Sequence, residues 1–260
     1  MSTFDLLQPS SFIVPNWSAA KNITAFTTTR LGGLSHEPYA SLNLGQHVGD
    51  DPLLVANNRQ RLPNWQNFFW LKQTHSTICL AVDEIDNNLS GTLEGDACFS
   101  TKAKQVCAVM TADCLPILLC DKAGTTVAAV HAGWRGLADG VIENTILKMK
   151  LPTGNLMAWM GPAISQTFFE VGEDVKQIFS QYPQAFKTNQ LSSEKKYYAD
   201  LYFIAKQKLL ALGVQDISGG NYCTYEQETH FFSHRRACHQ QDPINTPATT
   251  GRMVSAIYFE

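Results

Sequence analysis

Three side chains in this sequence have the chemistry of metal ligands, namely His75, Cys114 and His131, and each stands where a predicted β-strand ends. Two imidazoles and one thiolate suit tetrahedral zinc, and three protein ligands leave a fourth position open, as catalytic zinc sites do. Zinc with an open position lowers the pKa of bound water to about 7 and so supplies a nucleophile at neutral pH. The spacing of these three residues in the sequence matches no local metal-binding motif. The zinc site is therefore a hypothesis at this point.

A second hypothesis uses the same residues without a metal. Cys114 would be the nucleophile, His131 or His75 the general base, and Asp113 or Asp96 the carboxylate that orients the base. The sequence alone does not exclude such a cysteine hydrolase.

Other candidates for acid/base chemistry are Asp96, Asp113 and Glu170, although each of these carboxylates also suits a turn or a helix cap. Cys79, Cys107 and Cys120 stand in apolar runs, and we expect them to be ordinary core thiols. Four other histidines are expected to be structural residues held by hydrogen bonds, and these are His36, His47, His230 and His239.

Two arginine-containing segments favour ligand binding. Residues 133–136, Gly-Trp-Arg-Gly, come directly before a predicted helix, where exposed backbone N–H groups and Arg135 would attract phosphate. Residues 231–236, Phe-Phe-Ser-His-Arg-Arg, combine rings that could stack a base with guanidinium groups that could hold an anion, chiefly Phe232 and Arg236. The alternative is that these phenylalanines belong to the core and that one arginine is a surface residue.

The elements that must position these residues are short strands mixed with helices. Apolar and β-branched runs predict strands over residues 23–29, 106–110, 115–120 and 125–130, with a turn at 111–114. Helical spacing of apolar residues predicts helices over 140–150 and 197–212. The mixture indicates an α/β or α+β fold, and the absence of repeats and linkers favours one domain over residues 1–260.

Composition excludes several classes of protein. The 260 residues are 44% apolar and 17% charged, which is wrong for a disordered tail. The net charge of −3 lacks the cationic excess that nucleic-acid binding requires. No basic segment followed by an apolar stretch opens the chain, and no long apolar run interrupts it, so we expect a soluble cytoplasmic protein without a membrane partner. The seven cysteines form no Cys-x-x-Cys pair, which argues against a disulfide framework or a zinc ribbon.

The chain resembles the laccase-domain family, whose members are also described as multicopper polyphenol oxidases, as purine nucleoside phosphorylases with adenosine deaminase activity, and as the bacterial peptidoglycan editing factor. The match runs in order from about residue 27 to the C-terminus. Its motifs are TTRLGGLS (28–35), SLNL (41–44), QTHS (73–76), GDA (95–97), TADCLP (111–116), HAGWRG (131–136), GPAI (161–164), FFSHRR (231–236) and TGR (250–252).

The resemblance implies a single-domain α+β fold, in which a layered mixed β-sheet is flanked by helices, and zinc bound by the residues matching His75, Cys114 and His131. It implies phosphorolysis of adenosine, inosine, guanosine or methylthioadenosine, together with adenosine deamination. Asp96 and Asp113 are then the candidate proton carriers. The candidate substrate-binding residues are Arg30, Asn43, Arg135, Phe232 and Arg236.

Three other functions remain open at this stage. The resemblance also implies a hydrolase that edits peptidoglycan precursors at the same site. A copper polyphenol oxidase is disfavoured, because blue-copper sites add a weak axial methionine and a multicopper enzyme needs more ligands than seven scattered histidines provide. An interaction protein stapled by zinc is disfavoured because structural zinc sites have four protein ligands.

The chain departs from the family pattern at residues 237–249, which separate the Arg-Arg pair from the Thr-Gly-Arg motif. This insertion contains Cys238 and His239, and it predicts either a loop over the pocket or a projection into solvent. We interpret the adjacent Cys-His pair as part of a loop rather than as a second metal site, because no further ligands accompany it.

Overall fold

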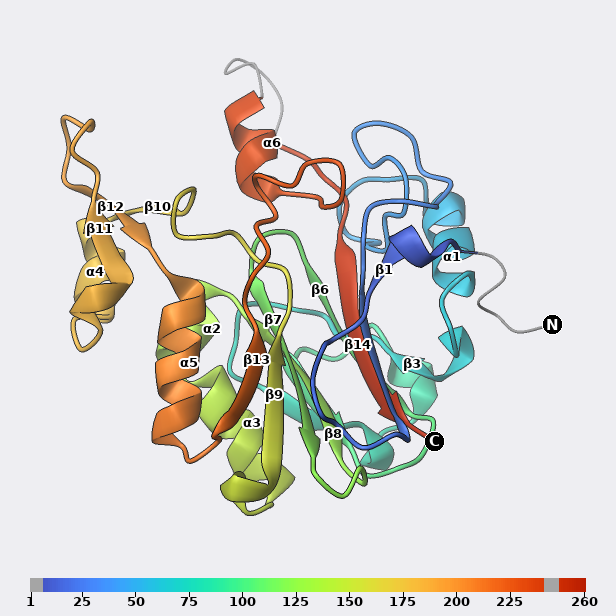
Figure 1. Ribbon diagram of the computed structural model, residues 1–260. Helices are drawn as coiled ribbons and strands as arrows, with labels where there is room; N and C mark the ends of the chain where they lie inside the picture. The colour runs from blue at the N-terminus through green and yellow to red at the C-terminus, as the bar shows by residue number, and fades with distance from the viewer. Residues whose placement is uncertain (1–6, 241–247) are drawn as a thin grey trace.

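Two β-sheets lie face to face at the centre of the computed structural model, which describes residues 7–240 and 248–260 (Figure 1). The five-stranded sheet has the order β1 (Phe12–Ile13), β2 (Ile23–Thr28), β14 (Met253–Phe259), β6 (Val106–Thr111) and β3 (Phe68–Phe69). The six-stranded sheet has the order β13 (Asp216–Gly219), β9 (Leu156–Met160), β7 (Leu115–Asp121), β8 (Val127–Ala132), β5 (Ala97–Ser100) and β4 (Cys79–Ala81). Both sheets mix parallel and antiparallel pairs.

The central strands are apolar on both faces because both faces are covered. On β7, Ile117 and Leu119 face the core beneath the helices, whereas Leu118 and Cys120 face the core between the two sheets. Successive side chains of a strand point to opposite faces, so a strand between two cores is a continuous apolar run. This explains why β7 is buried over its whole length.

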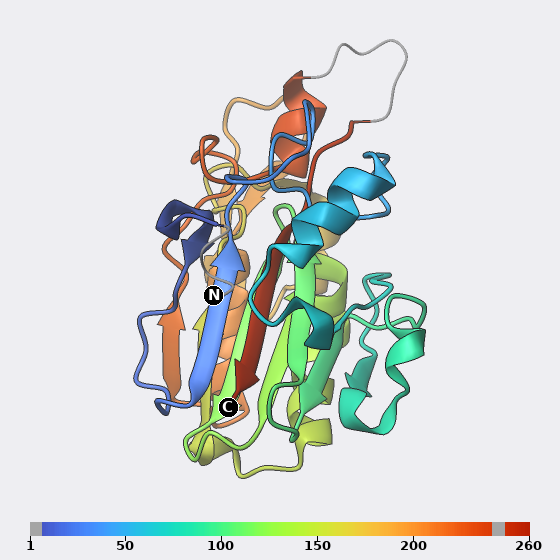
Figure 2. The same ribbon diagram turned by 90° about the vertical axis from the view of Figure 1, so that its right-hand side faces the viewer.

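Helices cover the outer faces of both sheets. Helices α2 (Trp134–Asp139), α3 (Val141–Met149) and α5 (Leu201–Ala211) contribute to the core on the outer side of the six-stranded sheet. Helix α1 (Pro52–Gln60) lies across the five-stranded sheet, as Figure 2 shows. A small sheet of order β10 (Glu170–Gly172), β12 (Lys196–Ala199) and β11 (Phe186–Thr188) stands at the side with α4 (Glu173–Ile178), and α6 (His234–Gln240) lies at the top in Figure 1.

The architecture confirms the predicted α+β class, and all four predicted strands are present, with the last shifted to Val127–Ala132 so that His131 lies inside it. The predicted thiols Cys79, Cys107 and Cys120 are fully buried. Among the described helices, none is long and apolar enough to cross a membrane.

Two helix predictions need correction. The glycine-rich segment after His131 is already helical from Trp134, and Gly140, with a φ of 99°, separates α2 from α3. The predicted helix over 197–212 begins too early, because residues 197–199 pair with both neighbouring strands of the small sheet. Helix α5 begins only after Asp200, whose side chain accepts a hydrogen bond from the Phe203 N–H and caps it.

The predicted turn at residues 111–114 joins two different sheets. Strand β6 ends at Thr111 in the five-stranded sheet, and β7 begins at Leu115 in the six-stranded sheet. Asp113 adopts a φ of 90°, in the left-handed region, which lets the chain reverse within a few residues. Cys114 therefore lies at the end of both sheets, directly before β7.

Candidate active site

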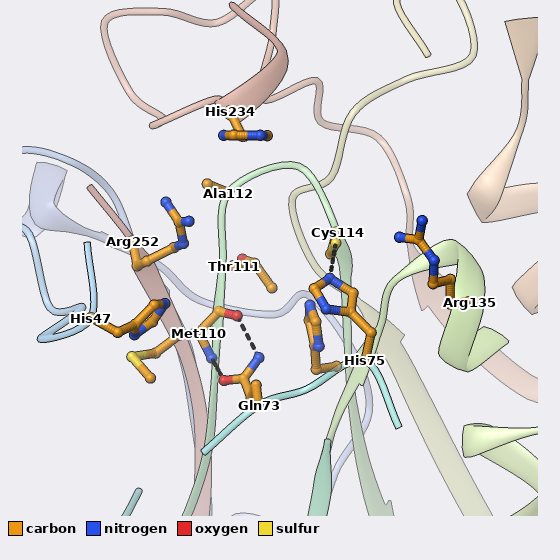
Figure 3. A pocket seen from close by; sticks show the side chains of 11 residues that line it. His47, Gln73, His75, Met110, Thr111, Ala112, Cys114, Arg135, His234 and Arg252 are labelled. Carbon is orange, nitrogen blue, oxygen red and sulfur yellow. Dashed lines mark hydrogen bonds between the residues drawn. The ribbon is translucent and has the colours of Figure 1, made fainter. Parts of the chain in front are cut away.

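A cavity of about 320 Å³ opens at this end of the sheets (Figure 3). Its lining residues come from β6, β8, α2 and α6 and from the segments beside them. They are His47, Gln73, His75, Met110, Thr111, Ala112, Cys114, His131, Arg135, His234 and Arg252. The three predicted metal ligands are therefore brought together in one cavity.

His75, Cys114 and His131 form a cluster whose ligand atoms all lie within 4.8 Å of one another. The Cys114 Sγ is 3.8 Å from the His75 Nε2, and the two imidazole centroids are 4.9 Å apart. On β8, His131 pairs with Pro116 of the neighbouring strand β7, and Pro116 follows Cys114 by two residues. Strand pairing therefore holds His131 close to Cys114. Within the described part of the chain this is the one group of three or more such residues close enough to hold a metal ion. The donor set and the spacing fit one metal ion with three protein ligands.

Asp96 organises both histidines from beneath the cluster. Its fully buried carboxylate accepts a hydrogen bond from His131 Nδ1 at 2.7 Å, so that the His131 Nε2 is left for the cluster. The same carboxylate accepts hydrogen bonds from the backbone N–H groups of Thr74, His75 and Ser76 and from the Ser76 hydroxyl. Carboxylate–histidine pairs of this kind fix the tautomer and orientation of metal-binding imidazoles.

Gln73 anchors the other side of the loop that carries His75. Its side-chain amide donates to the Met110 carbonyl and accepts from the Met110 N–H, at 2.8 and 2.7 Å (Figure 3). His75 itself has a φ of 60°, which is unusual for a residue with a Cβ. The Gln-Thr-His-Ser motif is thus held to β6 by Gln73 and to the residue before β5 by Asp96, which places the exposed His75 ring in the cluster.

Gly133 is required by space rather than by its backbone conformation. A Cβ at this position would lie 2.9 Å from the His75 Cδ2 and 3.0 Å from the Cys114 Sγ. Any side chain at residue 133 would therefore fill the space beside the two ligands. The glycine of the His-Ala-Gly-Trp-Arg-Gly motif keeps this space open.

The charges of the cluster favour the metal-binding form of Cys114, whereas His131 must release a proton before its Nε2 can bind a metal. Burial raises the pKa of Cys114, but the charges of His131 and His75 and their hydrogen bonds outweigh it and lower this pKa to about 6. Burial lowers the pKa of His131, but the Cys114 thiolate and Asp96 outweigh it and raise this pKa to about 9. Burial raises the pKa of Asp96, and the hydrogen bonds of His131 and Ser76 outweigh it and lower this pKa to about 2. Cys114 is therefore a thiolate at neutral pH, the form that binds metals.

The rest of the cavity wall carries cations and imidazoles. Figure 3 shows Arg252 and His47 on the side away from His75, with His234 above them. No aspartate or glutamate is among the described residues that line this cavity. Burial and the charge of Arg252 lower the pKa values of His47 and His234, so both imidazoles are uncharged at neutral pH. This composition favours an anionic or hydrogen-bonding ligand.

Of the five predicted substrate-binding residues, Arg135 alone lines the cavity. The Arg236 guanidinium is buried and donates to the carbonyls of Thr224, Tyr225 and Phe231. Phe232 is fully buried, and its ring fills the space that a Cβ on Gly251 would need. These two residues hold the C-terminal segments together.

Arg30 and Asn43 also lie outside the cavity. The Arg30 Nε donates to the Ala40 carbonyl, and its guanidinium lies 4.9 Å from the centroid of the Phe232 ring. Asn43 is fully buried, and its Oδ1 accepts hydrogen bonds from the backbone N–H groups of Gly45 and Arg252. Asn43 thus joins the Ser-Leu-Asn-Leu segment to the Thr-Gly-Arg segment.

The predicted proton carriers are engaged elsewhere. Asp113 accepts hydrogen bonds from the Thr224 hydroxyl and from the Arg235 N–H near the start of α6, both at 2.6 Å. Glu170 begins β10 and accepts a hydrogen bond from the Asn189 amide. The five donors around Asp96 likewise direct that carboxylate toward the loop and His131. None of the three carboxylates is among the residues lining the cavity.

The insertion over residues 237–249 lies partly outside the described residues, because 241–247 are not described. Its first residues, 237–240, form the end of α6. The Cys238 Sγ lies 3.6 Å from the His234 Nε2, whereas the His239 Nδ1 lies 3.0 Å from the Tyr225 hydroxyl. The prediction that this Cys-His pair lies in a loop is therefore wrong, because both residues belong to the end of α6, and their side chains have different partners.

Sequence reasoning missed His47, which was expected to be structural, and Arg252. The motifs gave part of the information needed to find these two residues, because His47 follows the Ser-Leu-Asn-Leu motif and Arg252 ends the Thr-Gly-Arg motif. The backbone hydrogen bond from Leu44 to Arg252 joins these segments. No spacing rule links residues more than 200 positions apart.

Comparison with known proteins places these motifs in a family. The model of the multi-copper polyphenol oxidoreductase laccase family matches residues 24–260. The chain belongs to this laccase family. The resemblance seen in the motifs is therefore confirmed over nearly the whole chain.

Several laccase-family relatives cover the chain from end to end. "Purine nucleoside phosphorylase YfiH" of Escherichia coli K12 is 43% identical, covering 96% of this chain and 99% of the relative. "Purine nucleoside phosphorylase" of Haemophilus influenzae is 44% identical, covering 95% and 99%. The crystal structure of Neisseria meningitidis protein NMB0706 matches with a TM-score of 0.86 at 44% identity, covering 96% of this chain and 99% of that one. The fold and the family are thus shared with proteins of known structure.

Proposed function

We propose that this protein is a zinc-dependent purine nucleoside phosphorylase whose active site is the cavity beside His75, Cys114 and His131. The observation that carries the proposal is the joint placement of a metal-ligand cluster and a cation-lined wall in one cavity. The curated relatives named as purine nucleoside phosphorylases support the reaction class. The substrates would be a purine nucleoside and phosphate.

Zinc is the ion that suits the cluster best. Two imidazoles and a thiolate form a tetrahedral site of borderline softness, and zinc in such a site supplies a Lewis acid at its open position. The family name includes copper, but the described residues provide one three-ligand group rather than the several groups of a multicopper oxidase. Zinc therefore remains our proposal, with copper as the less favoured ion.

The chain's own residues would do the remaining work. Gln73 and Asp96 hold the ligand loop rigid, so that the cluster keeps its geometry while substrates enter and leave. Arg135 and Arg252 face the cavity from opposite sides, so the cavity offers a guanidinium group to an anion on either side (Figure 3). Uncharged His234 can donate one hydrogen bond and accept another, which suits the edge of a purine or the ribose hydroxyls.

The direct test is to incubate the zinc-loaded protein with adenosine, with and without phosphate, and to separate the products by chromatography. We expect adenine that forms only when phosphate is present, and none from a Cys114→Ser variant. Inosine formed without phosphate would instead establish adenosine deamination. If neither product forms, the phosphorylase proposal fails, and hydrolysis of a peptidoglycan precursor becomes the reaction to test next.

A further inference from the structure

A second cavity of about 340 Å³ adjoins the active-site cavity, and the two share His47, Gln73 and Met110 as lining residues. Arg59, Trp70 and Lys72 are among the residues that line the second cavity but not the first. No aspartate or glutamate is among its described lining residues. The cation-lined wall of the active site therefore continues beyond His47.

Arg59 is a partly buried cation that has no carboxylate partner in the part of the chain that the structure describes. Its guanidinium stacks 3.6 Å from the centroid of the Trp70 ring, and its Nε donates to the Leu44 carbonyl at 2.9 Å. Its Nη2 lies 3.7 Å from the Met110 sulfur, which is a weak acceptor. No ion pair of Arg59 occurs within the described residues. Burial lowers the pKa of Arg59 to about 10, the direction expected for a cation that has lost its hydration.

Arg252 has the same character on the other side of His47. It is half-buried, and its Nη1 donates to the carbonyls of Thr250 and Gly251, whereas no ion pair to it is found in the described parts of the chain. Burial lowers the pKa of His47, and the charges of Arg252 and Arg59 lower it further, so both guanidinium groups act on this imidazole.

Lys72 provides the contrast within the same cavity. Its Nζ lies 3.1 Å from the Glu94 carboxylate, so its charge is compensated by the protein. Among the described residues neither Arg59 nor Arg252 forms an ion pair, although, against the effect of burial, the charges of Cys114 and Asp113 raise the pKa of Arg252. Desolvating a cation without a counter-charge is costly, and the cost is removed when an anion binds. The guanidinium groups also present paired N–H donors, which match the oxygens of phosphate.

We propose that Arg252, His47 and Arg59 together form a phosphate-binding site next to the metal cluster. This inference rests on the proposed function, since it names residues that would bind the phosphate of the reaction. The phosphate can come from two sources, either as the free inorganic ion or as a group carried by the substrate. Sequence motifs had pointed instead to Arg236, which the structure places outside the cavity.

The test measures binding without turnover, by calorimetric titration of the full-length, metal-loaded protein. Inorganic phosphate, adenosine 5′-monophosphate and adenosine are titrated separately. We expect inorganic phosphate to bind, and to bind at least about tenfold more weakly to Arg59→Met and Arg252→Met, since a charge-assisted hydrogen bond is lost in each. The Lys72→Met control, which removes a compensated cation from the same cavity, is expected to change the affinity less than twofold.

The outcomes separate the sources of phosphate. If inorganic phosphate does not bind but adenosine 5′-monophosphate binds at least tenfold more tightly than adenosine, and both arginine variants lose that advantage, the site binds a substrate-borne phosphate. If neither form of phosphate gains affinity from the arginines, or if Lys72→Met weakens binding equally, the proposal is overturned. Arg59→Gln and Arg252→Gln remove the charge but keep an amide N–H donor, and they replace any methionine variant whose thermal unfolding shows that it does not fold, with the same weakening expected.

Failure of this site is distinguishable from failure of the phosphorylase proposal. The titration requires no nucleoside cleavage, so a protein without phosphorolysis can still show the phosphate site. Conversely, adenine production that survives in Arg59→Met and Arg252→Met, with an unchanged phosphate requirement, would contradict the site and leave the reaction standing.

Discussion

The two walls of the active-site cavity are built in opposite ways. On the wall of His75, Cys114 and His131, every charged group has a partner, because Asp96 supports both histidines and Cys114 faces both imidazoles. On the wall of His47 and Arg252, the cations have carbonyl and aromatic neighbours but no carboxylate among the described residues. The first wall carries thiolate and carboxylate charges, whereas the second carries guanidinium charge.

This difference indicates what each wall binds. A preorganised set of anionic and neutral ligands suits a metal cation, and its rigid support keeps the ligands in place. A cationic wall without a counter-charge suits an anion that arrives as a substrate. In our proposal one cavity would therefore join a cation site and an anion site, which is the arrangement that phosphorolysis needs.

The largest effect is expected from removing a ligand on the metal wall. Cys114→Ser replaces the thiolate with a hydroxyl and should lower phosphorylase activity more than about a hundredfold, because a lost ligand costs more than a lost supporting residue. The matched control is Cys223→Ser, which alters a thiol held by Ser165 and Glu226 outside the cavity and should leave activity within twofold. Steady-state rates and bound metal measured by mass spectrometry give the comparison. Full activity in Cys114→Ser would remove the metal wall from the reaction.

The support beneath the metal wall should matter nearly as much. Asp96→Asn exchanges an acceptor of five hydrogen bonds for an amide that has only one oxygen, so we expect metal affinity to fall about ten- to a hundredfold. Competition with a chelator measures the metal affinity. Asp86→Asn, at an exposed helix cap, is the control. An unchanged affinity in Asp96→Asn would show that the histidines hold their orientation without this carboxylate.

A smaller effect is expected from filling the space beside the ligands. The Cβ of Gly133→Ala would lie within 3.0 Å of the Cys114 sulfur, which should displace a ligand by a few tenths of an ångström and lower metal affinity about tenfold. Gly154→Ala introduces the same methyl group where no atom lies within 4 Å and should change nothing. Competition with a chelator again measures the metal affinity of both variants. Equal metal affinities for Gly133→Ala and Gly154→Ala would contradict the tight geometry of the cluster.

The smallest effect on activity is expected from the arginine that the motifs favoured. Arg236→Met removes the donors of three backbone carbonyls and should lower the free energy of unfolding by about 3 kcal/mol. The KM for phosphate should stay within twofold of the wild-type value, because Arg236 lies outside the cavity. Chemical denaturation and steady-state kinetics measure the two quantities. A raised KM in a stable Arg236→Met protein would return this residue to the substrate site.

The metal wall was predictable because its residues belong to short contiguous motifs at strand ends. The strands that end at Thr111 and Ala132 were recognisable from their apolar runs, and these runs place Cys114 and His131 at one end of the fold. The sequence did not reveal that β6 and β7 belong to different sheets, because both strands are buried on both faces and read alike.

The opposite wall was not predictable for a different reason. Arg236 and Arg252 both belong to family motifs, but their side chains are used differently. Arg236 donates hydrogen bonds to carbonyls in the interior, whereas Arg252 faces the cavity. That choice depends on tertiary packing, such as the contact of Gly251 with the Phe232 ring. The early start predicted for the helix at 197–212 has a similar cause, because the small sheet takes residues 197–199 into a strand regardless of their helical pattern.

The most direct test of the central claim is a phosphorus-31 NMR measurement of zinc-loaded protein with inosine and inorganic phosphate. If one wall holds the metal and the other the phosphate, the inorganic phosphate signal should decline as a ribose 1-phosphate signal grows, with an equal amount of hypoxanthine released. Cleavage to hypoxanthine and free ribose with no new phosphate ester, or no cleavage at full zinc occupancy, would contradict the account.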